Sequence, residues 1–200
     1  MALFATSALW YKPILQLVKD TRSQRELAGM SLLTSVHDDD LLKGTIWISP
    51  PMLWDDAKYL KQHGLSIFST EDARPLNQPL TAIYKVMPSD QCSGFVDRVQ
   101  SFQQTSGGLK LEGWAVHSKS KRPLSGIVMV NEGLISGYGA PGIPRLDVEG
   151  TLRSRRARFS GWVGFVEPAA PGTATEVYGF IDSFGHHKVC KIGQVVSPGT

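Results

Sequence analysis

Residues 127–135, which read IVMVNEGLI, decide the fold class of this chain. Four apolar residues in a row are followed by Asn131, Glu132 and Gly133, and then by a second apolar pair. A short apolar run is typical of a buried strand, and the glycine-containing turn that follows it predicts a hairpin. We therefore expect a β-hairpin here and a β-rich unit around it.

The segments on either side of this hairpin continue the β pattern. Residues 109–116 read LKLEGWAV, in which successive side chains face opposite sides of a strand. Three further strand-like segments lie at residues 159–166, 176–182 and 189–192. The 20 glycines and 12 prolines of the chain favour many turns between short strands. The spacing predicts an antiparallel β-sandwich of about 6–8 strands.

The first third of the chain carries a helical pattern instead. Leu27, Met30 and Leu33 recur at helical spacing, and a second helix is predicted to begin after Ser49 and to end at Gly64. We therefore expect an α+β fold that leans towards all-β. Its predicted parts are a helical arm over residues 1–68, a linker over 69–90, the β-sandwich over 91–193 and a tail over 194–200.

An acidic cluster, Asp38, Asp39 and Asp40, precedes the apolar pair Leu41 and Leu42. Carboxylates at this place suit a helix N-terminus, where they accept hydrogen bonds from the free backbone N–H groups and face the positive end of the helix dipole. A divalent cation site is the alternative interpretation. No matching set of ligands follows in the sequence, so we expect capping and no metal.

The chain contains two cysteines, Cys92 and Cys190, and they bracket almost all of the β pattern. A bond between them would close a loop of about 98 residues and contribute about 4–5 kcal/mol in the loop-entropy model. Nothing in their spacing resembles a zinc site or a CxxC redox motif. A disulfide favours a compartment outside the cytoplasm, and two buried free thiols are the alternative.

The sequence carries no strong signal for a membrane or nucleic-acid partner. It has no window of about 20 apolar residues, so we expect no complete transmembrane helix. Residues 1–11 are apolar but lack a basic n-region and a clear cleavage site; they fit either the end of a membrane helix or a helix packed on the domain. The net charge of +3 is weak evidence for any partner, and a nucleic-acid binder usually shows a denser basic face interleaved with aromatics.

Several short motifs occur in a recognisable order along the chain. They are CSGFVD at 92–97, LEGWA at 111–115, RLDV at 145–148, SGWVGF at 160–165 and a closing Cys190. In this order they resemble a β-sandwich module that is appended to bacterial glycosyltransferases and to the tails of polytopic envelope proteins. Leu146 stands where that module usually has a proline.

The N-terminal part is similar to the segment that follows the last membrane helix in such proteins. The matching pieces are DDLL at 39–42, IWISP at 46–50, YLK at 59–61 and LSIF at 65–68. The resemblance covers about residues 22–192 and implies the periplasmic or other extracytoplasmic tail of a larger, membrane-associated bacterial envelope protein. The membrane helices expected upstream are absent from this sequence, so no transferase activity is assigned to it.

Two pairs of residues are candidates for glycan binding. Trp114 and Trp162 offer flat indole faces on which a sugar ring can stack, although a tryptophan in an alternating strand is more often part of the core. Arg145 and Asp147 offer donors and acceptors for sugar hydroxyls. They fit equally well a pairing with each other that holds a corner of the fold.

The single dense basic cluster is formed by four arginines, Arg153, Arg155, Arg156 and Arg158. Such a cluster suits contact with anionic lipid headgroups or lipopolysaccharide phosphates. A solvated loop at the edge of a strand is the more usual alternative.

Candidate catalytic residues are few. Glu112 and Asp147 are the carboxylates that would serve as a glycosidase pair if they converged, but nothing in the sequence indicates that they do. We therefore expect no catalytic residues and no cofactor. The resulting hypothesis is a non-catalytic extracytoplasmic domain that binds a glycan or supports envelope polysaccharide synthesis. A scaffold that docks on a membrane partner through residues 2–18 is the second hypothesis, and a glycoside hydrolase is the third.

Overall fold

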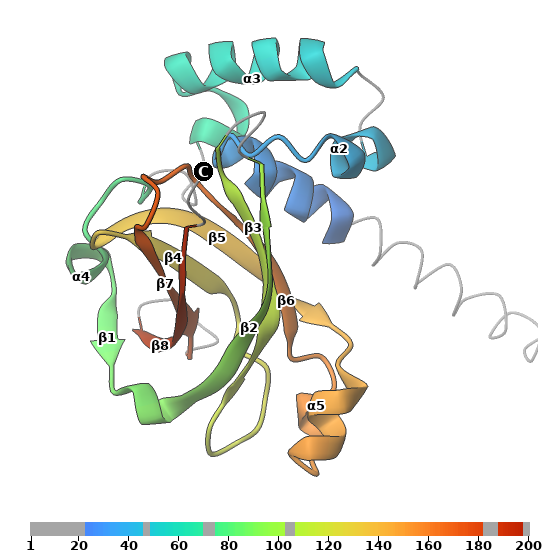
Figure 1. Ribbon diagram of the computed structural model, residues 1–200, viewed down its shortest axis with the longest axis vertical. Helices are drawn as coiled ribbons and strands as arrows, with labels where there is room; N and C mark the ends of the chain where they lie inside the picture. The colour runs from blue at the N-terminus through green and yellow to red at the C-terminus, as the bar shows by residue number, and fades with distance from the viewer. Residues whose placement is uncertain (1–22, 46–48, 70–74, 103–106, 182–187, 198–200) are drawn as a thin grey trace, which may run out of the picture.

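The predicted fold class is confirmed: the chain is an α+β protein in which the β-structure dominates (Figure 1). The computed structural model describes residues 23–45, 49–69, 75–102, 107–181 and 188–197. The apolar start at residues 1–11 lies outside these residues. None of the described helices is long and apolar enough to cross a membrane.

The described residues of the N-terminal arm, 23–45 and 49–68, are mostly helical, as their sequence pattern predicts. A helix covers residues 23–33 of the described part of the chain. It is followed by α2 (Asp39–Thr45), α3 (Pro50–His63) and the 3-10 turn η1 (Ser66–Ser69). Helix α3 begins with prolines in its first turn and ends at Gly64, which has the left-handed φ of 61° that favours glycine. Both predicted boundaries of this helix are therefore correct.

Eight strands form one curled, mixed sheet in the order β1-β8-β7-β4-β5-β6-β3-β2. Strand β1 pairs with β8 in parallel, and the other paired strands are antiparallel. The strands are β1 (Lys85–Met87), β2 (Cys92–Ser101), β3 (Leu109–His117), β4 (Ile127–Asn131), β5 (Leu134–Ile143), β6 (Gly161–Val166), β7 (Ala174–Phe180) and β8 (Lys188–Val196). A short helix, α4 (Leu80–Ile83), precedes β1, and further short helical segments lie between strands: η2 (Ser89–Gln91), α5 (Leu146–Thr151) and η3 (Arg155–Ala157).

The inner face of the curled sheet forms the main hydrophobic core. Its fully buried side chains come from several strands and include Leu111, Ile127, Met129, Trp162 and Val177. The outer face is covered in two places. The helical arm packs against Val163 and Phe165 of β6, and the segment around α4 packs against β4, β5 and β7. The packing of the helical arm explains why every residue of β6 is buried, which a strand with one solvated face would not show.

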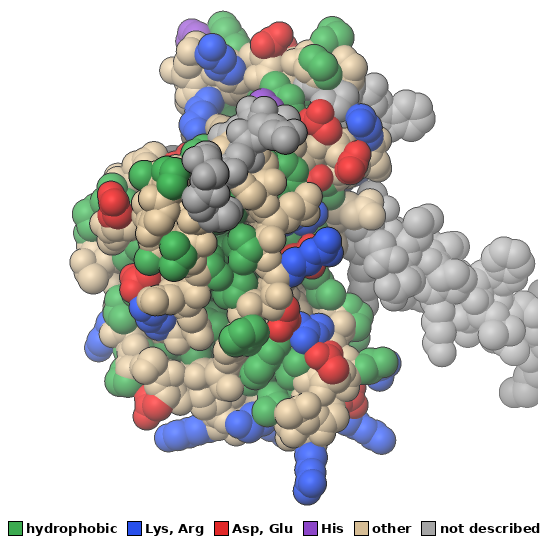
Figure 2. All heavy atoms as spheres, in the orientation of Figure 1, with side chains coloured by type: hydrophobic (Ala, Val, Ile, Leu, Met, Phe, Trp, Pro, Cys, Tyr) green, Lys and Arg blue, Asp and Glu red, His purple; other side chains and the backbone are tan. Residues whose placement is uncertain are grey.

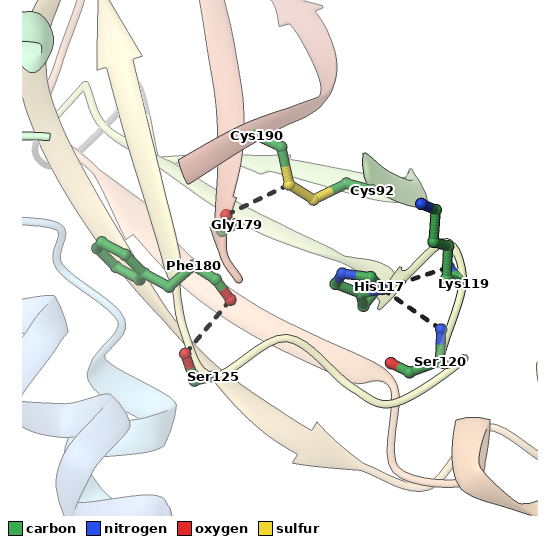
Figure 3. Close-up of a disulfide and its surroundings, with 8 residues drawn as sticks. All are labelled: Cys92, His117, Lys119, Ser120, Ser125, Gly179, Phe180 and Cys190. Atoms are coloured by element: carbon green, nitrogen blue, oxygen red, sulfur yellow. Dashed lines mark hydrogen bonds between the residues drawn. A yellow bond between two sulfur atoms is a disulfide. The ribbon is translucent and has the colours of Figure 1, made fainter. Parts of the chain in front are cut away.

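The two cysteines pair as a disulfide that joins the two ends of the sheet (Figure 3). Cys92 begins β2 at one edge, whereas Cys190 lies in β8, next to the opposite edge. Their Cα atoms are 6.0 Å apart, which is an ordinary separation for a disulfide. The bond therefore closes the curl at a place where β2 and β8 contact each other without pairing.

Four details differ from the sequence-based expectations. The strands form one continuous curled sheet in place of two separate sheets. Residues 69–90, expected to be a linker, include α4 and the edge strand β1, and β8 continues to Val196, beyond the expected end of the sandwich. Residues 145–148, expected to be a corner, form the start of α5, with Arg145 as the residue before the helix. The first turn of this helix carries acidic residues, which the helix dipole favours.

Candidate functional site

Trp162 is a core residue and cannot serve as a sugar platform. Only 1% of it is exposed, and it packs inside the curled sheet with Leu111 and Met129. Its ring lies against β3 at Gly113, where an added Cβ would come within 2.8 Å of the indole Cζ2. Among the described residues its Nε1 has no hydrogen-bond partner. Burial on this scale excludes ring stacking, so the core interpretation of this tryptophan is correct.

Trp114 lies on the outer face of β3, where it is half-buried. It packs against the cluster of Val116, Val148 and Ala157, which joins β3 to α5 and η3. Its cross-strand neighbour in β2 is Phe95. Side chains directly opposite in an antiparallel pair lie on the same face of the sheet, and Phe95 is 62% exposed. The exposed aromatic of this face is therefore Phe95, which the sequence analysis did not select.

Arg145 lies beside this aromatic pair and is held by two carboxylates. Its Nε donates to Asp147 Oδ1 at 2.9 Å and its Nη2 to Asp147 Oδ2 at 2.6 Å. Its Nη1 donates to Asp97 of β2. The predicted pairing of Arg145 with Asp147 is confirmed, and Asp97 is an additional partner that the sequence analysis missed.

Two backbone features place these side chains. The register of β2 against β3 shifts between Val96 and Arg98, so Asp97 is the extra residue of a β-bulge, and such bulges re-aim a side chain. Gly161 of β6 leaves room for the stem of the arginine, because an added Cβ would lie 3.0 Å from Arg145 Cγ and 2.9 Å from Ile143 Cβ. A bulge in one strand and a missing side chain in another thus bring Asp97 and Arg145 together.

The ion pairs set the charge state of this cluster. Hydrogen bonding to Arg145 lowers the pKa of Asp147 to about 2, and the same bond raises the pKa of the arginine. Asp147 therefore stays ionised at any physiological pH. Because Arg145 already neutralises one carboxylate, the group of Asp97, Arg145 and Asp147 carries one net negative charge.

A hollow of about 490 Å³ opens next to the cluster on the surface of β2, β3 and β6. Arg98 and Glu112, which are opposite each other in the β2–β3 register, add a second pair of opposite charges to its wall. Ile143, Val163 and the buried Trp162 supply its apolar part. Figure 2 shows acidic and basic side chains interleaved beside β2 and β3. The hollow thus offers closely spaced donors and acceptors on the strands that also carry Phe95 and Trp114, although neither of those two rings lines it.

The four arginines of the basic cluster lie apart from this hollow, on the segment formed by α5 and η3. All four are exposed. Arg158 Nε lies 3.9 Å from Glu149 Oε2, and its guanidinium lies 6.0 Å from the ring centroid of Phe159. The other three arginines form no ion pair with the residues that the structure describes.

The acidic cluster at the start of α2 has a structural role, as expected. Asp38 Oδ1 accepts the N–H of Leu41 at 3.2 Å, which is a helix cap, and Asp38 Oδ2 accepts from Lys110 Nζ at 2.7 Å. Asp39 Oδ1 accepts from Trp54 Nε1 at 3.1 Å and ties α3 to α2. The described residues contain no group of His, Cys, Asp and Glu arranged to hold a metal ion.

Glu112 and Asp147, the two carboxylates considered for glycoside hydrolysis, differ in their surroundings. Glu112 lines the hollow, while Asp147 is held by two hydrogen bonds from Arg145. A glycosidase needs one carboxylic acid with a raised pKa to protonate the leaving oxygen. The pKa of Asp147 is lowered, so this residue is unsuited to the acid role.

Searches of protein-family models, curated proteins and solved structures found no match to this chain. The resemblance to envelope-protein modules therefore depends on the sequence motifs of this chain alone.

Proposed function

We propose that this chain is a non-catalytic, extracytoplasmic module of a bacterial cell-envelope protein, and that it binds a glycan on the outer face of β2 and β3. The observation that carries the proposal is the exposed ring of Phe95, opposite Trp114 in the strand register and on the face that also holds the ion pairs of Arg145. Aromatic rings and planar polar groups on one face are the chemistry that recognises a sugar ring and its hydroxyls.

The polar groups suit a neutral or weakly charged glycan. A sugar hydroxyl donates one hydrogen bond and accepts others, and the hollow offers carboxylates as acceptors beside guanidinium groups as donors. The carboxylates Asp97 and Asp147 already have Arg145 as a partner, so the groups are held in position before a ligand binds. Such preorganisation reduces the entropy cost of binding.

The disulfide supports an extracytoplasmic location. Cys92 and Cys190 are both buried and joined to each other, and bonds of this kind persist in the bacterial periplasm but rarely in the cytosol. Membrane association of a parent protein follows from the resemblance alone and belongs to the same proposal.

The test is a titration of the purified chain with envelope glycans: peptidoglycan fragments, lipopolysaccharide oligosaccharides and neutral exopolysaccharides. We expect saturable quenching of tryptophan fluorescence with at least one of them, because Trp114 lies on the binding face. Phe95→Ala should weaken that affinity about tenfold, since it removes one aromatic contact.

Tyr59→Ala is the matched control, because Tyr59 is also an exposed aromatic but lies on α3 of the arm. It should leave the affinity unchanged. Failure of all the glycans to give a saturable response would reject glycan binding, and an equal loss in the two variants would reject the proposed face.

A scaffold function is the second candidate. Helix α3 exposes the side chains of Met52 and Tyr59, and Leu65 is exposed just beyond its end, which are apolar groups that a protein partner can cover. Residues 2–18, the docking segment expected from the sequence, lie outside the described residues. If the chain ignores glycans but binds a membrane protein in a way that Tyr59→Ala weakens, the scaffold function replaces the glycan function.

A further inference from the structure

Positive charge is concentrated in two segments of this chain. Residues 118–126 and 145–159 together contain eight basic and two acidic residues, a net charge of +6. The whole chain has a net charge of +3, so all the other residues together carry −3. The modest overall charge therefore hides a strong separation of charge within the molecule.

The fold brings these two segments to one end of the molecule. Strand β3 ends at His117, and its penultimate residue, Val116, packs against Val148 of α5 and Ala157 of η3. Figure 1 shows the β3–β4 connection and α5 at the same end, away from the helical arm, and Figure 2 shows basic side chains projecting from it. We call this surface the basic end; its cations are Lys119, Lys121, Arg122, Arg153, Arg155, Arg156 and Arg158, and its acidic residues are Asp147 and Glu149.

Six of the seven cations of the basic end form no ion pair with any described residue, and the seventh, Arg158, lies 3.9 Å from Glu149. The two acidic residues of the basic end are already engaged, Asp147 by Arg145 and Glu149 by Arg158. Arg153, Arg155 and Arg156 are exposed and form no ion pair with any described residue. The end therefore presents unpaired cations to any anionic surface that approaches it.

The turns that carry these cations are held by hydrogen bonds. His117 Nδ1 accepts the N–H groups of Lys119 at 3.2 Å and Ser120 at 3.3 Å, as Figure 3 shows. On the other segment, the N–H of Arg153 donates to Gly150 O at 3.2 Å. The charges thus sit on defined turns and need little ordering when a surface binds them.

Two large apolar side chains protrude from the same end. Leu146 is 63% exposed and Phe159 is 51% exposed. The N–H of Arg145 donates to Arg158 O at 2.7 Å, which brings together the two backbone segments that carry them. Exposed apolar groups among cations are the combination found at surfaces that bind the lipid–water interface.

We propose that the basic end docks this protein on a bilayer that contains anionic phospholipids, with Leu146 and Phe159 entering the headgroup region. This inference goes beyond glycan binding and uses different residues, so either can fail without the other. Leu146 and Phe159 protrude from the surface, which suits a bilayer interface, whereas a nucleic-acid site presents several aromatic rings along a groove. Charge complementarity and apolar insertion together favour the membrane as the occupant.

The test measures partitioning of the full chain onto vesicles of phosphatidylcholine, with and without phosphatidylglycerol, by co-sedimentation. We expect binding only to vesicles that contain phosphatidylglycerol, and loss of that binding as salt is added. The triple variant Arg153→Gln, Arg155→Gln, Arg156→Gln should lower the partition coefficient about 100-fold, because each basic residue near an anionic surface contributes a factor of about five.

The matched control is the triple variant Arg25→Gln, Lys58→Gln, Lys85→Gln. It removes the same charge from exposed residues on the arm and on β1, and it should leave partitioning nearly unchanged. Equal loss in the two triple variants, or equal binding to pure phosphatidylcholine, would overturn the proposal.

The apolar part of the proposal has its own variant. Leu146→Ser with Phe159→Ser keeps the charge and should reduce partitioning about tenfold or more, because two apolar side chains no longer leave water. An unchanged partition coefficient would overturn the insertion of these residues. Tighter binding to duplex DNA than to the vesicles at the same salt concentration would replace the membrane by nucleic acid as the occupant.

Discussion

Arg145 connects three parts of the fold that are distant in the sequence. It pairs with Asp97 of β2 and Asp147 of α5, and its stem lies over Gly161 of β6. A bidentate guanidinium–carboxylate pair has a fixed geometry that a lysine cannot reproduce. The side chain therefore fixes the relative positions of the three elements that surround the candidate glycan site.

The first prediction concerns the acid dependence of this cluster. The pKa of Asp147 is lowered to about 2 from 3.8 by its hydrogen bond with Arg145. A carboxylate with a depressed pKa in the folded state stabilises the fold above its ordinary pKa, and the contribution disappears as pH falls through the folded value. In urea unfolding followed by circular dichroism, Asp147→Asn should therefore be less stable than wild type at neutral pH, and the difference should vanish near pH 2.

Asp55→Asn, an exposed carboxylate on α3, serves as the control and should show no such convergence. A stability difference between wild type and Asp147→Asn that stayed constant from neutral pH to pH 2 would contradict the assigned pKa. The effect is small in size because Asp147 is exposed and its ion pair is screened by solvent.

Residue identity alone could not separate the roles of the aromatic side chains. The pattern of 109–116 and 159–166 correctly predicted strands. The alternation of side chains along a strand assigns them to two faces, but it does not say which face is covered by other parts of the protein. Trp162 points to the inner core and Phe95 points to solvent, and only the curl of the sheet decides this. The register that sets Phe95 opposite Trp114 is likewise a property of the paired strands and has no signal in either strand.

At the scale of elements, the helical arm is attached to the sheet by a charged contact. Asp38 caps α2 and pairs with Lys110 of β3, whose ammonium lies 5.7 Å from the ring centroid of Phe165. Apolar packing of Val36 against β6 surrounds this contact. Because Asp38 is only 5% exposed, the ion pair is shielded from water far more than an ordinary surface pair.

We predict that Asp38→Ala lowers the free energy of unfolding by about 3 kcal/mol, because it removes a helix cap and leaves the Lys110 ammonium without its partner. Hydrogen exchange measured by mass spectrometry should show loss of protection in α2 before the central strands. Asp40→Ala, in the same acidic cluster but fully exposed, should leave both stability and exchange unchanged. If α2 kept its full protection from hydrogen exchange in Asp38→Ala, the proposed attachment of the arm through Asp38 would be wrong.

Elements of different length were not equally predictable. The boundaries of α3 could be read from its prolines and Gly64, and the hairpin of β4 and β5 from its turn. Strand β1 has only three residues, Lys85–Met87, and is a strand because β8 lies next to it. Segments this short carry too little periodicity to stand out from a linker, and the same limit applies to the six-residue α5.

At the scale of the whole molecule, the disulfide spans the seam of the curled sheet. The sheet order places β2 at one edge and β8 beside the other, and 98 residues separate the two cysteines. The bracketing of the β pattern by cysteines could be read from the sequence. The single curled sheet could not, since it depends on β1 adding to β8 and on the arm covering β6.

The last prediction is that Cys92→Ser with Cys190→Ser lowers the free energy of unfolding by about 4–5 kcal/mol, because the unfolded chain regains the freedom of a long loop. The loss of stability should begin where the two ends of the curled sheet meet. Hydrogen exchange should increase first in β1 and β2, while β4, which has hydrogen-bonded neighbours on both sides, keeps its protection. Wild type in a reducing agent should behave like the double variant, because both lack only the bond. A loss below about 1 kcal/mol, or uniform exchange in all strands, would mean that hydrophobic packing alone closes the sheet.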